Sequence, residues 1–257
     1  MRRSQAHIAF GKCVLIGASP SAEQLRLAEA GGIEWRTIEP LRSIGDYSRF
    51  VLQELVHHVD TSHALIVQWD GFVTHPAMWE PGFLAWDYIG PPWYVKDRMH
   101  AVGNGGFSLR SRRLLAATAT LPYDGHSPED RVICIDCRAQ LESAGQIRFA
   151  PLDLARRFGV EQGPRVDAFG FHGIEHFAHE LSAQELATWL DDAPDSLIAH
   201  PHTRKLVKSL MRAGAWRQAM SLNTKRAKLI GWNRDMALLH VRAWLSQLLP
   251  SSTNHPG

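Results

Sequence analysis

A single aspartate, Asp70, is the first candidate for chemistry, because it follows the apolar segment 64–67 and precedes Gly71. Four apolar residues between polar flanks are typical of a short buried strand. In an open α/β sheet, ligands bind outside the carboxyl ends of the strands, so a carboxylate there could hold a ligand or a hard metal ion. An Asp-Gly pair is also common in ordinary turns, which leaves a purely structural role open.

A glycine-rich loop, Gly103-Asn-Gly-Gly106, precedes an apparent strand at 107–110. Gly105 and Gly106 carry no side chains, so a ligand could approach the backbone closely there. A tight turn would require the same residues, and the pattern does not separate the two interpretations.

Two neighbouring acids, Glu129 and Asp130, follow Ser127-Pro128. This order predicts a helix with Ser127 as its cap, Pro128 as its first residue and acids in the first turn, where the helix dipole favours them. Such a helix start needs no function. It would nevertheless hold an acid firmly enough to serve as a general base.

Three histidines, His172, His176 and His179, lie close together in the sequence. His172 stands between glycines, which predicts a loop, and the other two follow at helical spacing. A three-histidine metal site is one interpretation. No paired carboxylate motif accompanies these residues, which favours a solvated helix face instead.

Aromatic residues and prolines dominate residues 72–93, which end with Trp93. Aromatic side chains on loops can stack on sugar rings or bases, and others fill the core beneath the loops. We expect the two roles to be shared about evenly.

The elements that would position these residues alternate between strand and helix. Apolar spacing and capping residues predict strands at 13–18, 35–38, 63–67 and 147–150, and helices that begin at Ser19-Pro20, Asp46 and Ser111. Such a βαβ order favours a largely parallel sheet with helices on its faces.

Charge is divided unevenly along the 257 residues. From Thr203 onward there are ten Lys or Arg residues and one acid, a net charge of +9, whereas the preceding part carries −7. Apolar stripes after Ser182 recur at helical spacing. We therefore expect an α/β domain at residues 1–180 and a basic helical appendage at 181–257, which would meet an anionic partner or simply be solvated. No aromatic-basic motif for reading bases is present, so nucleic acid is not expected.

The remaining composition is that of an ordinary globular protein, with 45% hydrophobic and 21% charged residues. No apolar run approaches the roughly 20 residues that a membrane span needs. Three cysteines, Cys13, Cys134 and Cys137, do not make a disulfide framework. These features favour a cytoplasmic protein, which could also be peripheral on the inner membrane face.

Five segments in this order resemble a bacterial family of uncharacterised glycosyltransferase-like domains that often occur near polysaccharide genes. The segments are Gln68 to Phe72, Asp87 to Trp93, Gly103 to Ser111, Pro128 to Asp130 and Phe169 to Gly173, and the resemblance runs from about His7 to His179. It implies a GT-A-like (Rossmann-like) mixed sheet flanked by helices, in which Ala9 to Ile16 looks like the second strand. The first strand-helix unit is therefore expected to be missing or to lie upstream of Met1.

The resemblance implies a metal-dependent, inverting transfer from a nucleotide-sugar donor to a saccharide or lipid-linked acceptor in surface polysaccharide assembly. Mn²⁺ or Mg²⁺ would be held by Asp70 and His172, with Gln68 replacing the first acid of the D-x-D motif. Asp130 would be the base and Glu129 would contact the acceptor, although the sequence does not separate these two roles. Donor and acceptor would contact a further set of residues: Gln68, Trp69, Gly71, Trp93, Asn104, Gly105 and Gly106.

Two alternatives belong to other functional classes. The domain could be a catalytically degenerate sugar-binding or scaffolding domain of the same fold, an interpretation that Gln68 and the short N-terminus favour. A metal hydrolase that uses the histidines is a more distant third. The basic appendage would suit a peripheral contact with an anionic membrane.

Overall fold

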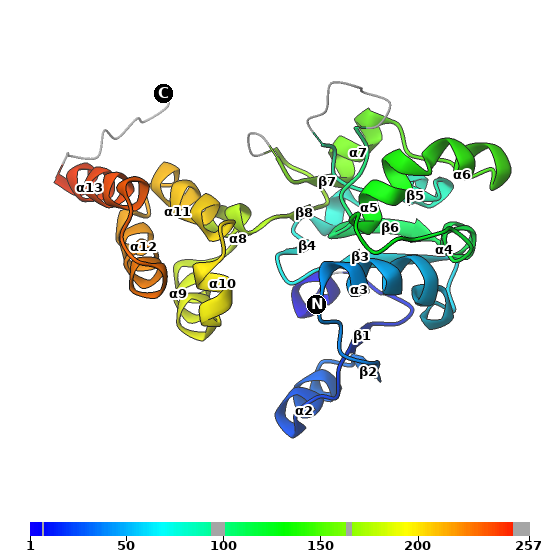
Figure 1. Cartoon of the computed structure of the whole chain (residues 1–257), viewed down its shortest axis with the longest axis horizontal. Helices are drawn as coiled ribbons and strands as arrows, with labels where there is room; N and C mark the ends of the chain where they lie inside the picture. Colours follow the sequence, from blue (N-terminus) through cyan, green and yellow to red (C-terminus); the bar gives the residue numbers. More distant parts are fainter. Residues whose placement is uncertain (7, 94–100, 163–165, 249–257) are drawn as a thin grey trace. The chain divides into compact units, whose positions relative to one another are not determined.

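The computed structural model describes residues 1–6, 8–93, 101–162 and 166–248. His7, where the family resemblance begins, and the last residues of the basic appendage, 249–257, lie outside the described residues. The chain forms two compact units, Met1–His172 and Gly173–Gly257 (Figure 1). The sequence predicted the boundary between the two units after residue 180, whereas the structure has it after His172.

The first unit is a mixed α/β structure with several small sheets. Its strands are β1 (Val14–Gly17), β2 (Glu34–Thr37), β3 (His63–Val67), β4 (Gly71–Val73), β5 (Tyr88–Ile89), β6 (Phe107–Ser111), β7 (Gly159–Val160) and β8 (Gly170–His172). Its helices are α1 (Arg2–Gln5), α2 (Ala22–Ala30), α3 (Ile44–Arg49), α4 (Arg112–Thr118), α5 (Glu129–Arg131), α6 (Arg138–Ala144) and α7 (Leu152–Phe158).

The expectation of a largely parallel sheet was wrong for the described strands. β1 and β2 pair in parallel, as do β7 and β8, but β3–β6, β5–β6 and β4–β8 are antiparallel. The strand expected at 147–150 is only a bridge between Phe149 and Tyr88. Short strands can pair in either direction. Tertiary packing decides the partner and the direction, and the alternation of strands and helices along the sequence does not reveal it.

Helix starts are set by local capping hydrogen bonds. Ser111 accepts a hydrogen bond from the Leu114 N–H and caps α4, as predicted. Two other predicted caps were wrong, because Ser21 caps α2 in place of Ser19 and Ser43 caps α3 in place of Asp46. At α5, Pro128 takes the cap position expected for Ser127, and no side chain caps this helix.

Aromatic packing holds the core of the first unit beneath the loops. Phe83, Phe107, Phe158 and Phe169 are fully buried, and ring centroids of contacting pairs are 5.1–6.1 Å apart. Trp69, in contrast, is 55% exposed. Aromatic residues in this part of the chain therefore serve both the core and the surface.

The second unit is helical, as the apolar stripes indicated. After a 3-10 turn at Ile174–His176 come α8 (Phe177–Glu180), α9 (Ala183–Asp192), α10 (Asp195–Ala199), α11 (Thr203–Arg212), α12 (Trp216–Ile230) and α13 (Arg234–Leu248). His176 is buried whereas His179 is exposed, so the solvated histidine face was wrong for His176. Within the described residues, no helix is both long enough and apolar enough to cross a membrane.

Candidate functional site

Asp70 lies three residues after the end of β3, and His172 is the last residue of β8. β8 pairs with β4, which begins at Gly71, so the pairing places Gly71 opposite His172 and brings the two candidate ligands together. Asp70 Oδ1 is 3.2 Å from His172 Nε2, and the side chains are 13% and 16% exposed. The structure thus unites two residues that are about a hundred positions apart.

His172 is surrounded by polar groups from three other segments. Its Nε2 is 3.2 Å from Gln68 Oε1, while its Nδ1 is 2.9 Å from Asn104 Nδ2 and 3.5 Å from Glu161 Oε1. Burial alone would lower the pKa of His172, but the Asp70 and Glu161 carboxylates outweigh burial and raise this pKa to about 9. The two acids therefore lie beside opposite nitrogens of the ring and favour its charged form.

Asp70 Oδ1 is buried and has no hydrogen-bond partner within the described part of the chain. Its contact with His172 is close enough for an ion pair, but the geometry is not that of a hydrogen bond. Two neighbouring ligands of an octahedral ion are about 3 Å apart when each bond is about 2.1 Å. The Asp70–His172 separation fits such a pair of ligands.

No larger group of metal ligands was found in the parts of the chain that the structure describes. Within them, no three His, Cys, Asp or Glu side chains are arranged to hold one ion. Glu161 is near His172 but faces the other ring nitrogen from Asp70. The protein therefore offers two adjacent donors rather than a complete cage.

The loop 104–106 positions His172 through two residues, Asn104 and Gly106. Asn104 has a φ of +59°, a conformation that Asn tolerates better than most residues. Its side-chain oxygen accepts a hydrogen bond from the Phe107 N–H, which directs its amide nitrogen toward His172. A Cβ atom at Gly106 would lie only 2.1 Å from His172 Nε2, so this position needs glycine for the histidine to fit.

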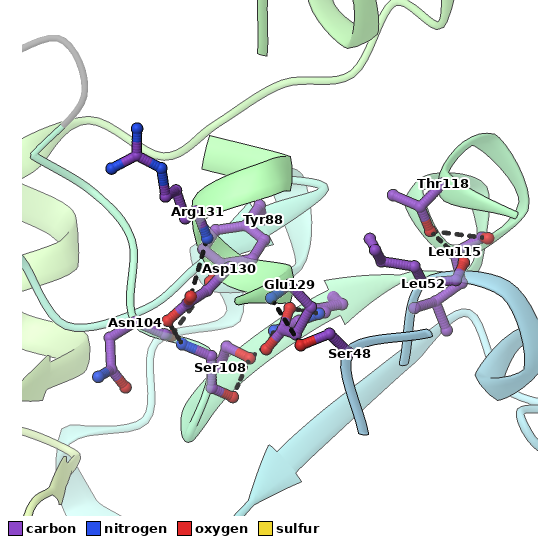
Figure 2. Close-up of polar contacts among 12 residues, drawn as sticks. Ser48, Leu52, Tyr88, Asn104, Ser108, Leu115, Thr118, Glu129, Asp130 and Arg131 are labelled. Atoms are coloured by element: carbon purple, nitrogen blue, oxygen red, sulfur yellow. Dashed lines mark hydrogen bonds and ion pairs between the residues drawn. The ribbon is translucent and has the colours of Figure 1, made fainter. Parts of the chain in front are cut away.

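Glu129 and Asp130 are neighbours on α5 but have different environments (Figure 2). Glu129 is 3% exposed, and its two oxygens accept hydrogen bonds of 2.7 and 2.9 Å from the fully buried Arg110. Burial raises the pKa of Glu129, and Arg110 opposes that shift. Glu129 is therefore held in the core by Arg110, and its expected contact with an acceptor stays a prediction.

Asp130 is partly exposed and is held by the backbone. Its Oδ2 accepts a hydrogen bond of 3.0 Å from the Gly105 N–H, and its Oδ1 accepts one of 2.8 Å from the Arg131 N–H. Because Gly105 and Gly106 contact Asp130 and His172 respectively, the same short loop joins the acid on α5 to the Asp70–His172 pair.

The other predicted contact residues have mixed placements. Gln68 donates a 2.8 Å hydrogen bond to the Tyr47 hydroxyl, and Trp69 is exposed beside it. Gly71 lies where a Cβ atom would be 2.7 Å from the Phe171 carbonyl oxygen, which is a packing requirement. Trp93 is partly buried and packs against Gly103 and the core.

Sequence reasoning missed Tyr47 and Glu161. Tyr47 lies on α3, and burial together with the Glu129 charge raises its pKa to about 12. Glu161 directly follows β7, so it repeats the pattern of an acid just beyond a short strand that drew attention to Asp70. That pattern could have identified Glu161, but no local feature marks Tyr47.

One family of known proteins matches this chain. A family model described as protein of unknown function (DUF5672) matches residues 33–172. No curated protein and no solved structure matches the chain. The matched range is more than half of the 257 residues and includes the residues that form the site, from Tyr47 to His172. The chain therefore belongs to the DUF5672 family of proteins of unknown function.

Proposed function

We propose that the protein is a metal-dependent, inverting glycosyltransferase with a GT-A-like first unit, which uses a nucleotide-sugar donor. The observation that carries the proposal is the buried Asp70 Oδ1 beyond the end of β3, which lies 3.2 Å from His172 Nε2 and has no hydrogen-bond partner among the described residues. The resemblance of the surrounding segments to glycosyltransferase-like domains supplies the class of reaction, and a saccharide or lipid-linked acceptor fits that class.

Asp70 and His172 would hold Mn²⁺ or Mg²⁺ as neighbouring ligands, with diphosphate and water oxygens completing the coordination shell. The ion would stabilise negative charge on the departing nucleoside diphosphate. His172 must be neutral to act as a ligand, so binding of the ion releases a proton from it. Trp69, exposed next to Asp70, offers a flat apolar face for a base or a sugar ring.

Asp130 takes the role of general base in this proposal. Hydrogen bonds from the Gly105 and Arg131 N–H groups orient its carboxylate, while the adjacent Glu129 is fixed by Arg110. The acceptor hydroxyl would lose its proton to Asp130 as its oxygen attacks the anomeric carbon, and the bond from that carbon to the diphosphate would break. Attack from the opposite side inverts the configuration of the sugar.

A second candidate, a catalytically degenerate sugar-binding or scaffolding domain, is favoured by one contact. Gln68 stands where the D-x-D motif has an acid, and its Oε1 is 3.2 Å from the same His172 nitrogen that would bind the metal. In that case the Gln68–His172–Asp70 group would be a structural network with no exchangeable ligand.

Calorimetry with a nucleoside diphosphate, in the presence and absence of Mn²⁺, separates the two candidates. The transferase should bind the nucleotide more tightly with Mn²⁺, and Asp70→Asn should remove that difference. Asp60→Asn is the matched control, because its side chain is 74% exposed and its ion-pair contacts are with Lys12 and Arg36. If the wild-type protein shows the same nucleotide affinity with and without Mn²⁺, the metal-dependent proposal is wrong.

A further inference from the structure

α13 is apolar on two opposite faces. Met236 and Ala243, each 1% exposed, lie on the face that packs within the helical unit, where Asn223 of α12 donates a 2.8 Å hydrogen bond to the Met236 carbonyl oxygen. Leu238, Val241 and Leu245 lie on the other face, at 62%, 54% and 50% exposed. A helix with a single packed face normally presents polar residues to solvent. Because the outer face of α13 is apolar, we expect a partner to cover it.

Two exposed tryptophans lie beside this outer face, next to His240. Trp232 is 55% exposed, and its ring lies edge-on to His240 of α13, with centroids 5.3 Å apart. Trp244, 51% exposed, is one helical turn beyond His240 and therefore beside it. We define the α13 outer face by five residues: Trp232, Leu238, Val241, Trp244 and Leu245.

Positive charge borders the α13 outer face. Arg234 and Arg242 are exposed on α13, and Lys228 is exposed in the last turn of α12. None of these three has an ion-pair partner among the residues that the structure describes. Asp235, the only acid from residue 203 onward, is already bound by the Arg204 fork. The bases around the outer face are therefore available to an external anion.

We propose that the α13 outer face docks on a bilayer surface rich in anionic phospholipids. Aliphatic side chains would enter the boundary between headgroups and acyl chains, Trp232 and Trp244 would lie at the interface, and the flanking bases would contact lipid phosphates. A second copy of this chain is a poorer partner, because it would bring two sets of unpaired bases together. This proposal does not depend on the proposed transferase activity.

Vesicle sedimentation of the full chain tests the charge requirement. Vesicles of an equal mixture of phosphatidylcholine and phosphatidylglycerol should sediment the protein at low salt, and vesicles of phosphatidylcholine alone should not. Raising the salt to about 0.5 M should release most of the bound protein. Equal sedimentation with both lipids, or none with either, would overturn the proposal.

Two matched pairs of variants test the location. Trp244→Ser with Leu245→Ser should weaken vesicle binding about tenfold or more, whereas Ile44→Ser with Leu84→Ser, equally exposed in the first unit, should not. Arg234→Gln with Arg242→Gln should weaken it by about thirtyfold, whereas Arg26→Gln with Arg42→Gln, exposed in the first unit, should have a much smaller effect.

Size-exclusion chromatography tests whether a second copy of this chain, and not a lipid bilayer, covers the α13 outer face. All substituted residues are exposed, so the variants should keep the wild-type thermal unfolding curve. A wild-type dimer that Trp244→Ser with Leu245→Ser converts to monomer, with vesicle binding unchanged, would show that the face joins two copies and that the lipid proposal is wrong.

Discussion

Glu129 and Asp130 share a helix turn but contribute to different properties of the protein. Glu129 closes a buried ion pair with Arg110, which also lies over the Tyr88 ring at 5.1 Å. Asp130 reaches the glycine loop at the edge of the site. Stability and turnover should consequently respond to different residues of the pair.

Asp130→Asn should lower turnover by about 10²–10⁴-fold, the usual contribution of a positioned general base, and should leave nucleotide binding unchanged. Glu129→Gln should instead lower the free energy of unfolding by about 3–5 kcal/mol, because it leaves the Arg110 charge buried without its partner. Transfer kinetics and urea unfolding of both variants measure the two effects. Turnover of Asp130→Asn within about threefold of wild type would exclude it as the base.

At the residue scale, a local pattern marks three of the candidate residues that the structure brings close to the loop 104–106. Asp70 follows an apolar run, His172 stands between glycines, and Asp130 lies in the first turn of a helix. The partners of the neighbouring residues Gln68 and Glu129 were not predictable. Tyr47 and Arg110 reach Gln68 and Glu129 through contacts that depend on the folded arrangement.

Among the elements, β5 is held by one buried acid. Asp87, 4% exposed, accepts hydrogen bonds from the Ser111 hydroxyl, the Arg113 guanidinium and the Arg148 N–H. These contacts join β5 to the end of β6, the start of α4 and the segment before Phe149. Burial raises the pKa of Asp87, but the hydrogen bonds outweigh burial and hold this pKa below its ordinary value of 3.8.

Asp87→Asn should lower the free energy of unfolding by about 1–3 kcal/mol at neutral pH, because hydrogen bonds to a charged group are lost. A lowered pKa in the folded state means that the charge contributes stability above pH 3.8 and loses that contribution as the pH falls through the folded value. The difference between wild type and variant should therefore shrink below about pH 4. A constant difference from pH 3 to pH 7 in urea unfolding would contradict this account.

Strand β3 was predictable from its apolar run, whereas its pairing was not. β3 and the segment that forms β6 were each visible in the sequence, but their antiparallel register, with His63 opposite Ser111, depends on packing across the sheet. The capping residues Ser21 and Ser43 each lie within three residues of the predicted caps. Several serines and aspartates there could accept the same backbone hydrogen bond, so the local sequence did not decide between them.

At the scale of the whole molecule, the second unit contains a buried cation that weakens it. In the second unit, Arg226 is 4% exposed, and its Nε and Nη1 atoms have no hydrogen-bond partner among the described residues. Burial and the nearby Arg204 charge lower the pKa of Arg226. The Asp235 charge opposes this shift, but a buried cation whose donors lack hydrogen-bond partners costs stability unless a ligand from outside compensates it.

Arg226→Met should stabilise the helical unit by about 1–3 kcal/mol, because it replaces a buried charge with unsatisfied donors by an apolar side chain of similar length. Scanning calorimetry should show this change in one unfolding transition, while Asp87→Asn shifts another, if the units unfold separately. Arg226→Lys is the control that keeps the charge. A lower melting temperature for Arg226→Met would instead indicate that an anion compensates the guanidinium in solution.

The order Asn104-Gly105 has a consequence for the chemical ageing of the protein. In an Asn-Gly pair the glycine nitrogen can attack the asparagine side-chain carbonyl carbon and release ammonia, and water then opens the resulting succinimide to aspartate or isoaspartate. Here the Gly105 N–H is bound to Asp130, and the Asn104 amide is bound at both ends. The folded site thus protects this pair, and partial unfolding would allow Asn104 to become an extra acid beside His172.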